Sequence, residues 1–272
     1  MKESSVVGDL VGPLASGPLL LVSPHLDDAA LSCAALLGRE QPADVLIVFA
    51  GDPDPPRQGS WDRVTGFANS AESMPARRAE ERAAFAGSRH RLHLLDLLEW
   101  QHLAGPRPAA DGERIAAAVM RWHERNGGGV VALPAGAGLT PGRLRARLRR
   151  TARARIWPTQ HPDHVFSRDA ALQVLVPLED VQLVLYEEFP YSRVKDADDV
   201  ASRLARRYGL AADCIGVRVD RDAKAARIGI YATQVPHLVI DGRRVDRAQD
   251  LPPEERYWVM KRQRERWPPS RR

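Results

Sequence analysis

Cysteine is scarce in this sequence, and long apolar runs are absent. Two cysteines, Cys33 and Cys214, occur in 272 residues, which excludes a disulfide framework and a zinc site built from cysteines. Both lie in apolar periodic segments, so we expect small buried residues. No window approaches the roughly 20 uninterrupted apolar residues that cross a bilayer, and the first ten residues lack the apolar centre of a secretory signal. The sequence therefore predicts a cytoplasmic protein with no membrane partner.

A large excess of charge of one sign is also lacking. Lys and Arg number 40 against 35 Asp and Glu, for a net charge of +5, so the surface is mixed and permits acidic ligands without requiring them. Apolar residues make up 44% of the chain, enough for a sizeable core. The length suits one large α/β domain or two small ones, and we favour a single domain over 1–272.

Short β-rich runs alternate with longer segments of helical period, which is typical of βαβ units. This pattern predicts an α/β fold with a Rossmann-like, doubly wound and mostly parallel sheet flanked by helices. The expected strands lie near 18–23, 44–50, 91–95, 129–133, 182–187 and 214–219. The expected helices cover 28–39, 74–87, 111–126 and 164–176. Long irregular connections are expected at 51–75 and 134–158.

Three groups that are costly to bury follow the first expected strand, in "PHLDD" at residues 24–28. His25 and Asp28 are three residues apart and can converge on one ion while Asp27 points elsewhere. A catalytic zinc ion needs at least a third protein ligand, and "HPDH" supplies His161 and His164 at an expected helix start. Because ligands bind at the carboxyl ends of strands in such sheets, two clusters at these places predict a metal site.

Two simpler interpretations apply to parts of this pattern. Adjacent aspartates that open a helix are often only an N-cap and a compensation of the helix dipole. Histidines without such neighbours are expected at the surface or in packing, and these are His90, His93, His102, His123 and His237.

Taken together, "PHLDD" and "HPDH" resemble the LmbE-like or PIG-L family of zinc-dependent N-acetylglucosamine deacetylases. The likeness extends to "ARRAEERAAFAG", "YEEFPY", "KAARIGIYATQVP" and "ERYW", so it spans roughly residues 18 to 258. The resemblance implies that the chain removes the acetyl group from the 2-acetamido group of a small-molecule GlcNAc-type sugar conjugate.

Carried over by position, the resemblance assigns His25, Asp28 and His164 as metal ligands and Asp27 as general base. The ion would be zinc, although ferrous iron accepts the same ligands. His161 would stabilise the tetrahedral intermediate or protonate the leaving amine, with Asp163 as its orienting partner or a substrate contact. Asp27 is an alternative source of that proton.

Several further residues match the family more loosely. Arg77 matches an arginine that reaches the substrate, although a surface pair with Glu80 or Glu81 is equally compatible with its helical spacing. We expect Glu99 to be a solvated surface residue. Residues Glu187, Glu188 and Tyr191 are expected at a strand end near the site, and Tyr231 and Gln234 are expected to pack and hydrogen-bond internally.

Two departures from the family pattern stand out. Thr159 occupies the place where some relatives carry a mobile tyrosine, and an Arg-rich insertion at about 139–158 has seven arginines between residues 143 and 155. The insertion could be an exposed flap, a lid that meets an anionic substrate, or a nucleic-acid patch, although it lacks the interleaved aromatics of such patches. We therefore expect no nucleic-acid partner.

Two rival functions are compatible with the same motifs. One is hydrolysis of a different small amide, and the other is a metal-binding or nucleotide-binding Rossmann-like module without catalysis. The non-catalytic module has no need of Asp27. The oligomeric state, the native metal and the rest of the substrate are not predicted.

Overall fold

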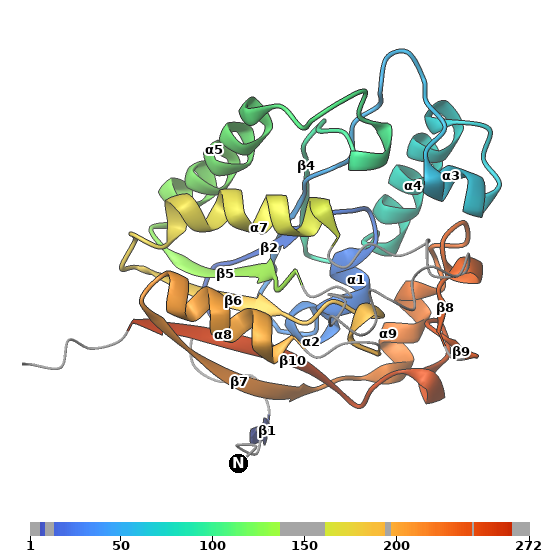
Figure 1. Cartoon of the computed structure of the whole chain (residues 1–272). Helices are drawn as coiled ribbons and strands as arrows, with labels where there is room; N and C mark the ends of the chain where they lie inside the picture. The colour runs from blue at the N-terminus through green and yellow to red at the C-terminus, as the bar shows by residue number, and fades with distance from the viewer. Residues whose placement is uncertain (1–5, 9–13, 137–160, 194–196, 241, 263–272) are drawn as a thin grey trace, which may run out of the picture.

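One mixed sheet organises the part of the chain that this computed structural model describes, namely residues 6–8, 14–136, 161–193, 197–240 and 242–262. Its eight strands follow the order β1-β7-β10-β6-β5-β2-β3-β4 (Figure 1). They are β1 (Val6–Gly8), β2 (Leu19–Ser23), β3 (Asp44–Ile47), β4 (Arg91–Leu94), β5 (Gly129–Pro134), β6 (Val181–Tyr186), β7 (Leu210–Arg218) and β10 (Glu254–Arg262). Only β10 among these strands runs antiparallel to its neighbours, β6 and β7, and the remaining pairs are parallel. A separate hairpin pairs β8 (Val239–Ile240) with β9 (Arg243–Arg244).

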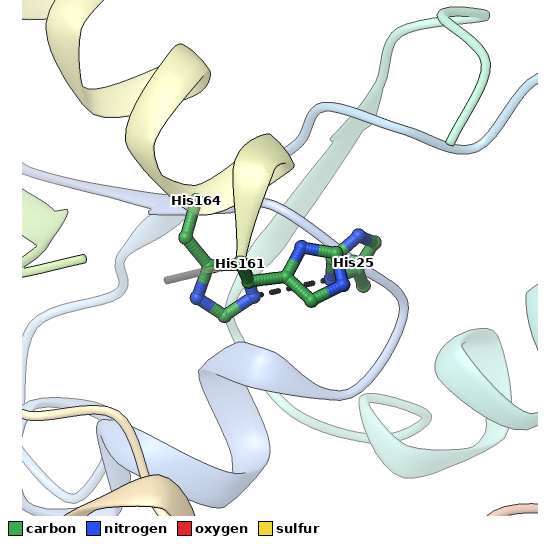
Figure 2. A group of neighbouring side chains, drawn as sticks. All are labelled: His25, His161 and His164. Carbon is green, nitrogen blue, oxygen red and sulfur yellow. Dashed lines mark hydrogen bonds between the residues drawn. The ribbon is translucent and has the colours of Figure 1, made fainter. Parts of the chain in front are cut away.

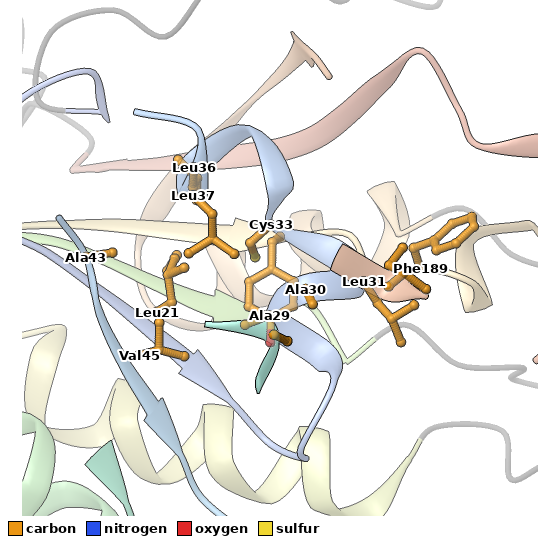
Figure 3. Packing of buried hydrophobic residues seen from close by; sticks show 14 of the residues in the cluster. Leu21, Ala29, Ala30, Leu31, Cys33, Leu36, Leu37, Ala43, Val45 and Phe189 are labelled. Carbon is orange, nitrogen blue, oxygen red and sulfur yellow. The ribbon is translucent and has the colours of Figure 1, made fainter. Parts of the chain in front are cut away.

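Helices cover both faces of this sheet, which confirms the predicted α/β fold. They are α1 (Asp28–Ser32), α2 (Ala34–Leu37), α3 (Ser60–Thr65), α4 (Ser70–Ala84), α5 (Ala109–Asn126), α7 (Pro162–Leu175), α8 (Asp198–Arg207) and α9 (Arg221–Ile228). Successive side chains of a strand point to opposite faces. Leu21 of β2 therefore packs in the cluster of α1 and α2 (Figure 3), while Leu20 and Val22 pack in the cluster of α5, α7 and α8. A strand buried on both faces reads as the continuous apolar run "LLLV".

The expected strands are all present, but the sequence did not predict several other elements, among them the short strands β1, β8 and β9. Strand β10 was missed because its charged residues interrupt the apolar pattern, and the short helices α3, α8 and α9 were missed too. The interval 51–75 is not a long irregular connection, since it contains α3 and the start of α4. Cys214 is only partly buried and accepts a contact of 3.5 Å from Arg256 Nη2, whereas Cys33 is buried as expected.

The expected helix over 28–39 is broken into two at Cys33. The backbone amides of Ala34 and Ala35 donate to the two carboxylate oxygens of Glu255, each over 2.9 Å. A carboxylate at this position satisfies amides that begin a helix. Glu255 of β10 therefore starts α2 as a new helix, 220 residues away in the sequence.

The carboxyl ends of β2, β5 and β6 meet at one edge of the sheet. Strand β2 lies between β3 and β5, so the chain leaves β2 toward one side and returns on the other. Such a reversal of strand order creates the crevice in which open α/β sheets bind ligands. Residues 24–28 follow β2 directly, α7 follows β5, and Glu188 follows β6. None of the described helices is long and apolar enough to cross a membrane.

Replacing Leu21 with Ala should destabilise the protein strongly, because Leu21 has no exposed surface and its loss leaves a cavity between β2 and α2. We expect a decrease of about 2–5 kcal/mol in the free energy of unfolding, measured by urea denaturation. Val64→Ala is the control, because Val64 is 43% exposed and should change stability by less than about 0.5 kcal/mol. Equal effects of the two substitutions would contradict this assignment of the core.

Candidate metal centre

Three side-chain atoms from two distant segments form a small triangle at the edge of the sheet. His25 Nδ1 lies 3.2 Å from Asp28 Oδ2 and 3.2 Å from His164 Nε2, and His164 Nε2 lies 3.3 Å from Asp28 Oδ2. Ligands placed about 2.0–2.1 Å from one tetrahedral ion are about 3.3 Å apart. The three atoms therefore have the spacing that a single divalent ion requires. Figure 2 shows the two imidazoles facing each other, with the dashed line joining them.

A carboxylate behind each histidine determines which ring nitrogen carries the proton. His25 Nε2 lies 3.0 Å from Asp163 Oδ2, and His164 Nδ1 lies 3.3 Å from Glu188 Oε1. Because an ionised carboxylate only accepts hydrogen bonds, each of these nitrogens donates. The lone pairs of His25 Nδ1 and His164 Nε2 are then directed into the triangle. Such carboxylate–histidine pairs orient the ligands of metal sites.

The electrostatics of the triangle favour a positive charge within it. Burial lowers the pKa of His164, but the charge of Asp28 and hydrogen bonds to Asp28 and Glu188 outweigh it and raise the pKa to about 9. His25 behaves likewise, since hydrogen bonds to Asp163 and Asp28 overcome its burial and raise its pKa well above the usual range. Two facing lone pairs and a buried carboxylate favour a cation between them. A divalent ion supplies that positive charge while both imidazoles remain neutral.

His161 belongs to the same cluster and forms a second possible triad with His25 and His164. One nitrogen of each of the three rings lies within 4.8 Å of the others, and the His161 and His25 rings meet edge to face at 4.6 Å (Figure 2). Trp100 Nε1 donates to His161 Nε2 over 3.3 Å. With Nε2 accepting, the proton of the neutral ring sits on Nδ1, which is buried and has no hydrogen-bond partner among the described residues. Burial, with the charges of His25 and His164, holds the pKa of His161 well below its usual range.

Asp27 lies beside the triangle without joining it. The N-capping interpretation is wrong for this residue, because its side chain makes no cap hydrogen bond to α1. Its backbone has a φ of +158°, which is uncommon for a residue other than glycine and frequent at functional sites. Burial raises the pKa of the Asp27 carboxyl to about 7, and the neighbouring charge of Asp28 adds to the increase.

Asp163, predicted to orient His161 or touch substrate, is bonded to His25 instead. It is fully buried and accepts hydrogen bonds from the Trp100 backbone amide at 3.0 Å and from Arg107. Arg107, in turn, lies over the Phe49 ring at 4.3 Å. The sequence carried no signal for Arg107 because it stands in a Pro- and Gly-rich loop far from either motif.

A pocket opens beside the candidate metal centre. Its lining comprises His25, Asp27, Asp28, Leu31, Ser60, Trp61, Arg77, Glu99, Trp100, Gln101, His161, Phe189, Pro190, Tyr191 and Leu238. Two expectations are wrong here. Arg77 does not form a surface pair with Glu80 or Glu81, and Glu99 is not a solvated surface residue. Both are 3% exposed and pair with each other at 2.5 Å, because each buried charge needs the other.

Other residues singled out from the sequence lie around this pocket or away from it. Tyr191 packs edge to face on His164 at 5.8 Å. Tyr231 and Gln234 are buried and bonded internally as expected, to Glu81 at 2.6 Å and to Trp61 at 2.5 Å. The five remaining histidines lie outside the cluster. Thr159 and the Arg-rich insertion lie outside the described residues.

Comparison with known proteins identifies relatives of this fold. No family model matches the sequence, and no curated protein matches it. Among solved structures, the chain is similar to a triple mutant of a deacetylase of the teicoplanin biosynthetic pathway, with a TM-score of 0.67, 23% identity and coverage of 91% of this chain and 99% of that chain. The zinc-inhibited form of teicoplanin deacetylase gives a TM-score of 0.65 and 21% identity over 91% and 99%. The A40926 pseudoaglycone deacetylase gives 0.60 and 23% over 90% and 97%. The predicted resemblance is thus confirmed at the level of the fold.

Replacing Asp163 with Asn should weaken metal binding about 10–100-fold, because the amide cannot hold His25 in the same orientation as a carboxylate. Competition between the protein and a chromophoric chelator for Zn²⁺ measures this loss. Asp169→Asn is the matched control on the same helix, because Asp169 pairs with Arg168 outside the cluster. Wild-type affinity in Asp163→Asn would show that this carboxylate does not support a ligand.

Proposed function

We propose that this protein is a metal-dependent hydrolase that removes the acetyl group from the 2-acetamido group of a GlcNAc-type sugar conjugate. The observation that carries the proposal is the triangle of His25 Nδ1, Asp28 Oδ2 and His164 Nε2, with sides of 3.2–3.3 Å. Three protein ligands leave room for water and substrate at the ion, as in catalytic sites. When bound there, a divalent ion acidifies water and polarises an amide carbonyl.

Asp27 is the general base in this proposal. It lines the pocket beside His25 and Asp28 and is held out of the triangle by the backbone turn that follows His25. A carboxyl whose pKa is raised to about 7 accepts a proton more strongly than an ordinary aspartate. Efficient base catalysis needs a group with a pKa near the working pH, so Asp27 is suited to take the proton of the attacking water.

His161 serves as a hydrogen-bond donor in this proposal and does not ligate the ion. Its Nε2 is engaged by Trp100, which leaves Nδ1–H as the group to offer. Such a donor stabilises negative charge that develops on a carbonyl oxygen. To protonate the departing amine, the ring would first have to take up a second proton, which its lowered pKa disfavours. Asp27 is the alternative source of that proton.

The other walls of the pocket suit a sugar. Trp61 and Trp100 line it, and aromatic faces pack against the apolar C–H faces of sugar rings. The buried pair of Arg77 and Glu99 supplies a charged donor and acceptor for hydroxyl groups. A solved neighbour of this fold is a deacetylase in complex with teicoplanin, matched with a TM-score of 0.64 and 20% identity, which supports an acylated glycoside as the substrate class.

Zinc is the ion that we propose, with ferrous iron as the alternative that the same ligands accept. Two imidazoles and one carboxylate suit either metal. A neighbour of this fold, teicoplanin deacetylase, has a zinc-inhibited form, so the test of each ion must include activity as well as binding. Metal analysis of the purified protein, followed by activity measured at one equivalent of each ion, decides between them.

Replacing Asp27 with Ala should abolish deacetylation while metal binding persists, because Asp27 acts on water and ligates nothing. We expect a decrease of at least about 100-fold in kcat, measured as amine release from acetylated sugar conjugates. His164→Ala should lose both metal and activity. Asp180→Ala, in an exposed pair with His123, is the control. Turnover by Asp27→Ala at the wild-type rate would show that the base is a different group.

The substitution His161→Ala distinguishes two possible sets of metal ligands. In one set Asp28 joins His25 and His164, and in the other His161 does. If His161 is a donor, the variant keeps its affinity for the ion and loses about 100-fold or more in kcat, in the same amine-release measurement. If it is a ligand, affinity for the ion falls together with activity. A metal-binding module without catalysis would release no amine in any of these proteins, including the wild type.

A further inference from the structure

A second cavity lies between α2, the end of β7 and α9, outside the pocket described above. Its charged lining consists of Arg39, Arg218, Asp220, Lys224 and Arg227. Lys224 is neutralised by Glu255 at 2.6 Å. Asp220 is used as the N-cap of α9, where it accepts from the amides of Asp222 and Ala223. The guanidinium groups of Arg39, Arg218 and Arg227 remain, and we call this second cavity the arginine cavity.

None of the three arginines forms an ion pair with a described residue. Their other contacts are few: Arg39 Nη2 donates to the Gly17 carbonyl oxygen and to Gln41 Oε1, and Arg227 lies over the Phe85 ring at 5.3 Å. Arg39 is only 7% exposed, and its Nε and Nη1 have no hydrogen-bond partner in the described part of the chain. Buried donors without acceptors are costly, and each such group in a native protein calls for a ligand or a bound water. Arg218 is exposed and Arg227 is half-buried.

The positive field extends beyond the lining itself. His90, next to this region, has its pKa lowered by burial and then by the charges of Arg227, Arg89 and Arg39. An accumulation of positive charge in a concave, partly apolar site attracts anions and strengthens hydrogen bonds to them. Alanine and leucine side chains of α2 form the rest of one wall, so the site suits an anionic group attached to a small apolar body.

We propose that the arginine cavity binds a small ligand through a phosphate-like oxyanion held by Arg218 and Arg227, with the buried charge of Arg39 adding to the positive field behind them. Planar guanidinium forks match the oxygen geometry of such groups. The site is separate from the candidate metal centre, because the two cavities share no lining residue. Lys224 lies between the two cavities. It lines the arginine cavity, and its Nζ lies 5.0 Å from the ring centroid of Phe189, which lines the pocket beside the candidate metal centre.

Titration calorimetry of the metal-loaded protein with inorganic phosphate at low ionic strength tests this proposal. The informative variants are Arg218→Gln and Arg227→Gln, singly and together, because neither side chain is fully buried and both proteins should fold. Each single substitution should weaken phosphate binding by about tenfold, and the double variant by more, since each removes a charge-assisted hydrogen bond.

Arg203→Gln is the charge-matched control, because Arg203 is exposed on α8 on the opposite face of the sheet, and it should bind phosphate as the wild type does. Phosphate binding that is absent in the wild type overturns the proposal. So does an affinity that is equal in the wild type and the double variant, which would place the phosphate at the metal. Deacetylase activity does not enter the readout, so the outcome is independent of the proposed function.

Discussion

Two imidazole lone pairs and a carboxylate oxygen face one another within 3.3 Å at the edge of the sheet, and the rest of the site is arranged around this juxtaposition. Without a cation the arrangement is repulsive, and although burial lowers the pKa values of His25 and His164, hydrogen bonds to neighbouring carboxylates and the charge of Asp28 raise both. An ion in the triangle satisfies all three groups at once. The raised pKa of Asp27 and the depressed pKa of His161 follow first from burial and then from the charges of the triangle beside them.

The fold supplies each part of the site from a different strand end. The turn after β2 provides His25 and Asp28, the helix after β5 provides His164, and the end of β6 provides Glu188. These segments are adjacent because strand order reverses between β2 and β5. Rigid strands buried on both faces hold the ligands with little freedom, whereas the pocket wall is built from loops and short helices that carry Trp61 and Trp100.

Several buried charges in this half of the molecule are compensated in pairs. Arg77 pairs with Glu99, Lys224 with Glu255, and Arg107 with Asp163. Glu255 also begins α2 through two backbone amides, so one carboxylate connects β10 to the helix beneath the site. Against this background, the arginines of the second cavity stand apart, because none of them forms an ion pair with a described residue, and the proposed oxyanion would compensate their charge.

Local pattern determined the six expected strands, the helices α4, α5 and α7, the mostly parallel sheet and the two motifs with their ligand-type residues. Alternation, helical period and short-range spacing are properties of residues close in sequence. Only tertiary structure decided which groups meet. The partners of His25 and His164, the burial of Glu99 by Arg77, the break at Cys33 by Glu255 and the engagement of His161 by Trp100 all join segments 22 to 221 residues apart. A buried charge and an exposed one look alike in sequence, since the free energy that separates them depends on a partner brought from elsewhere in the chain.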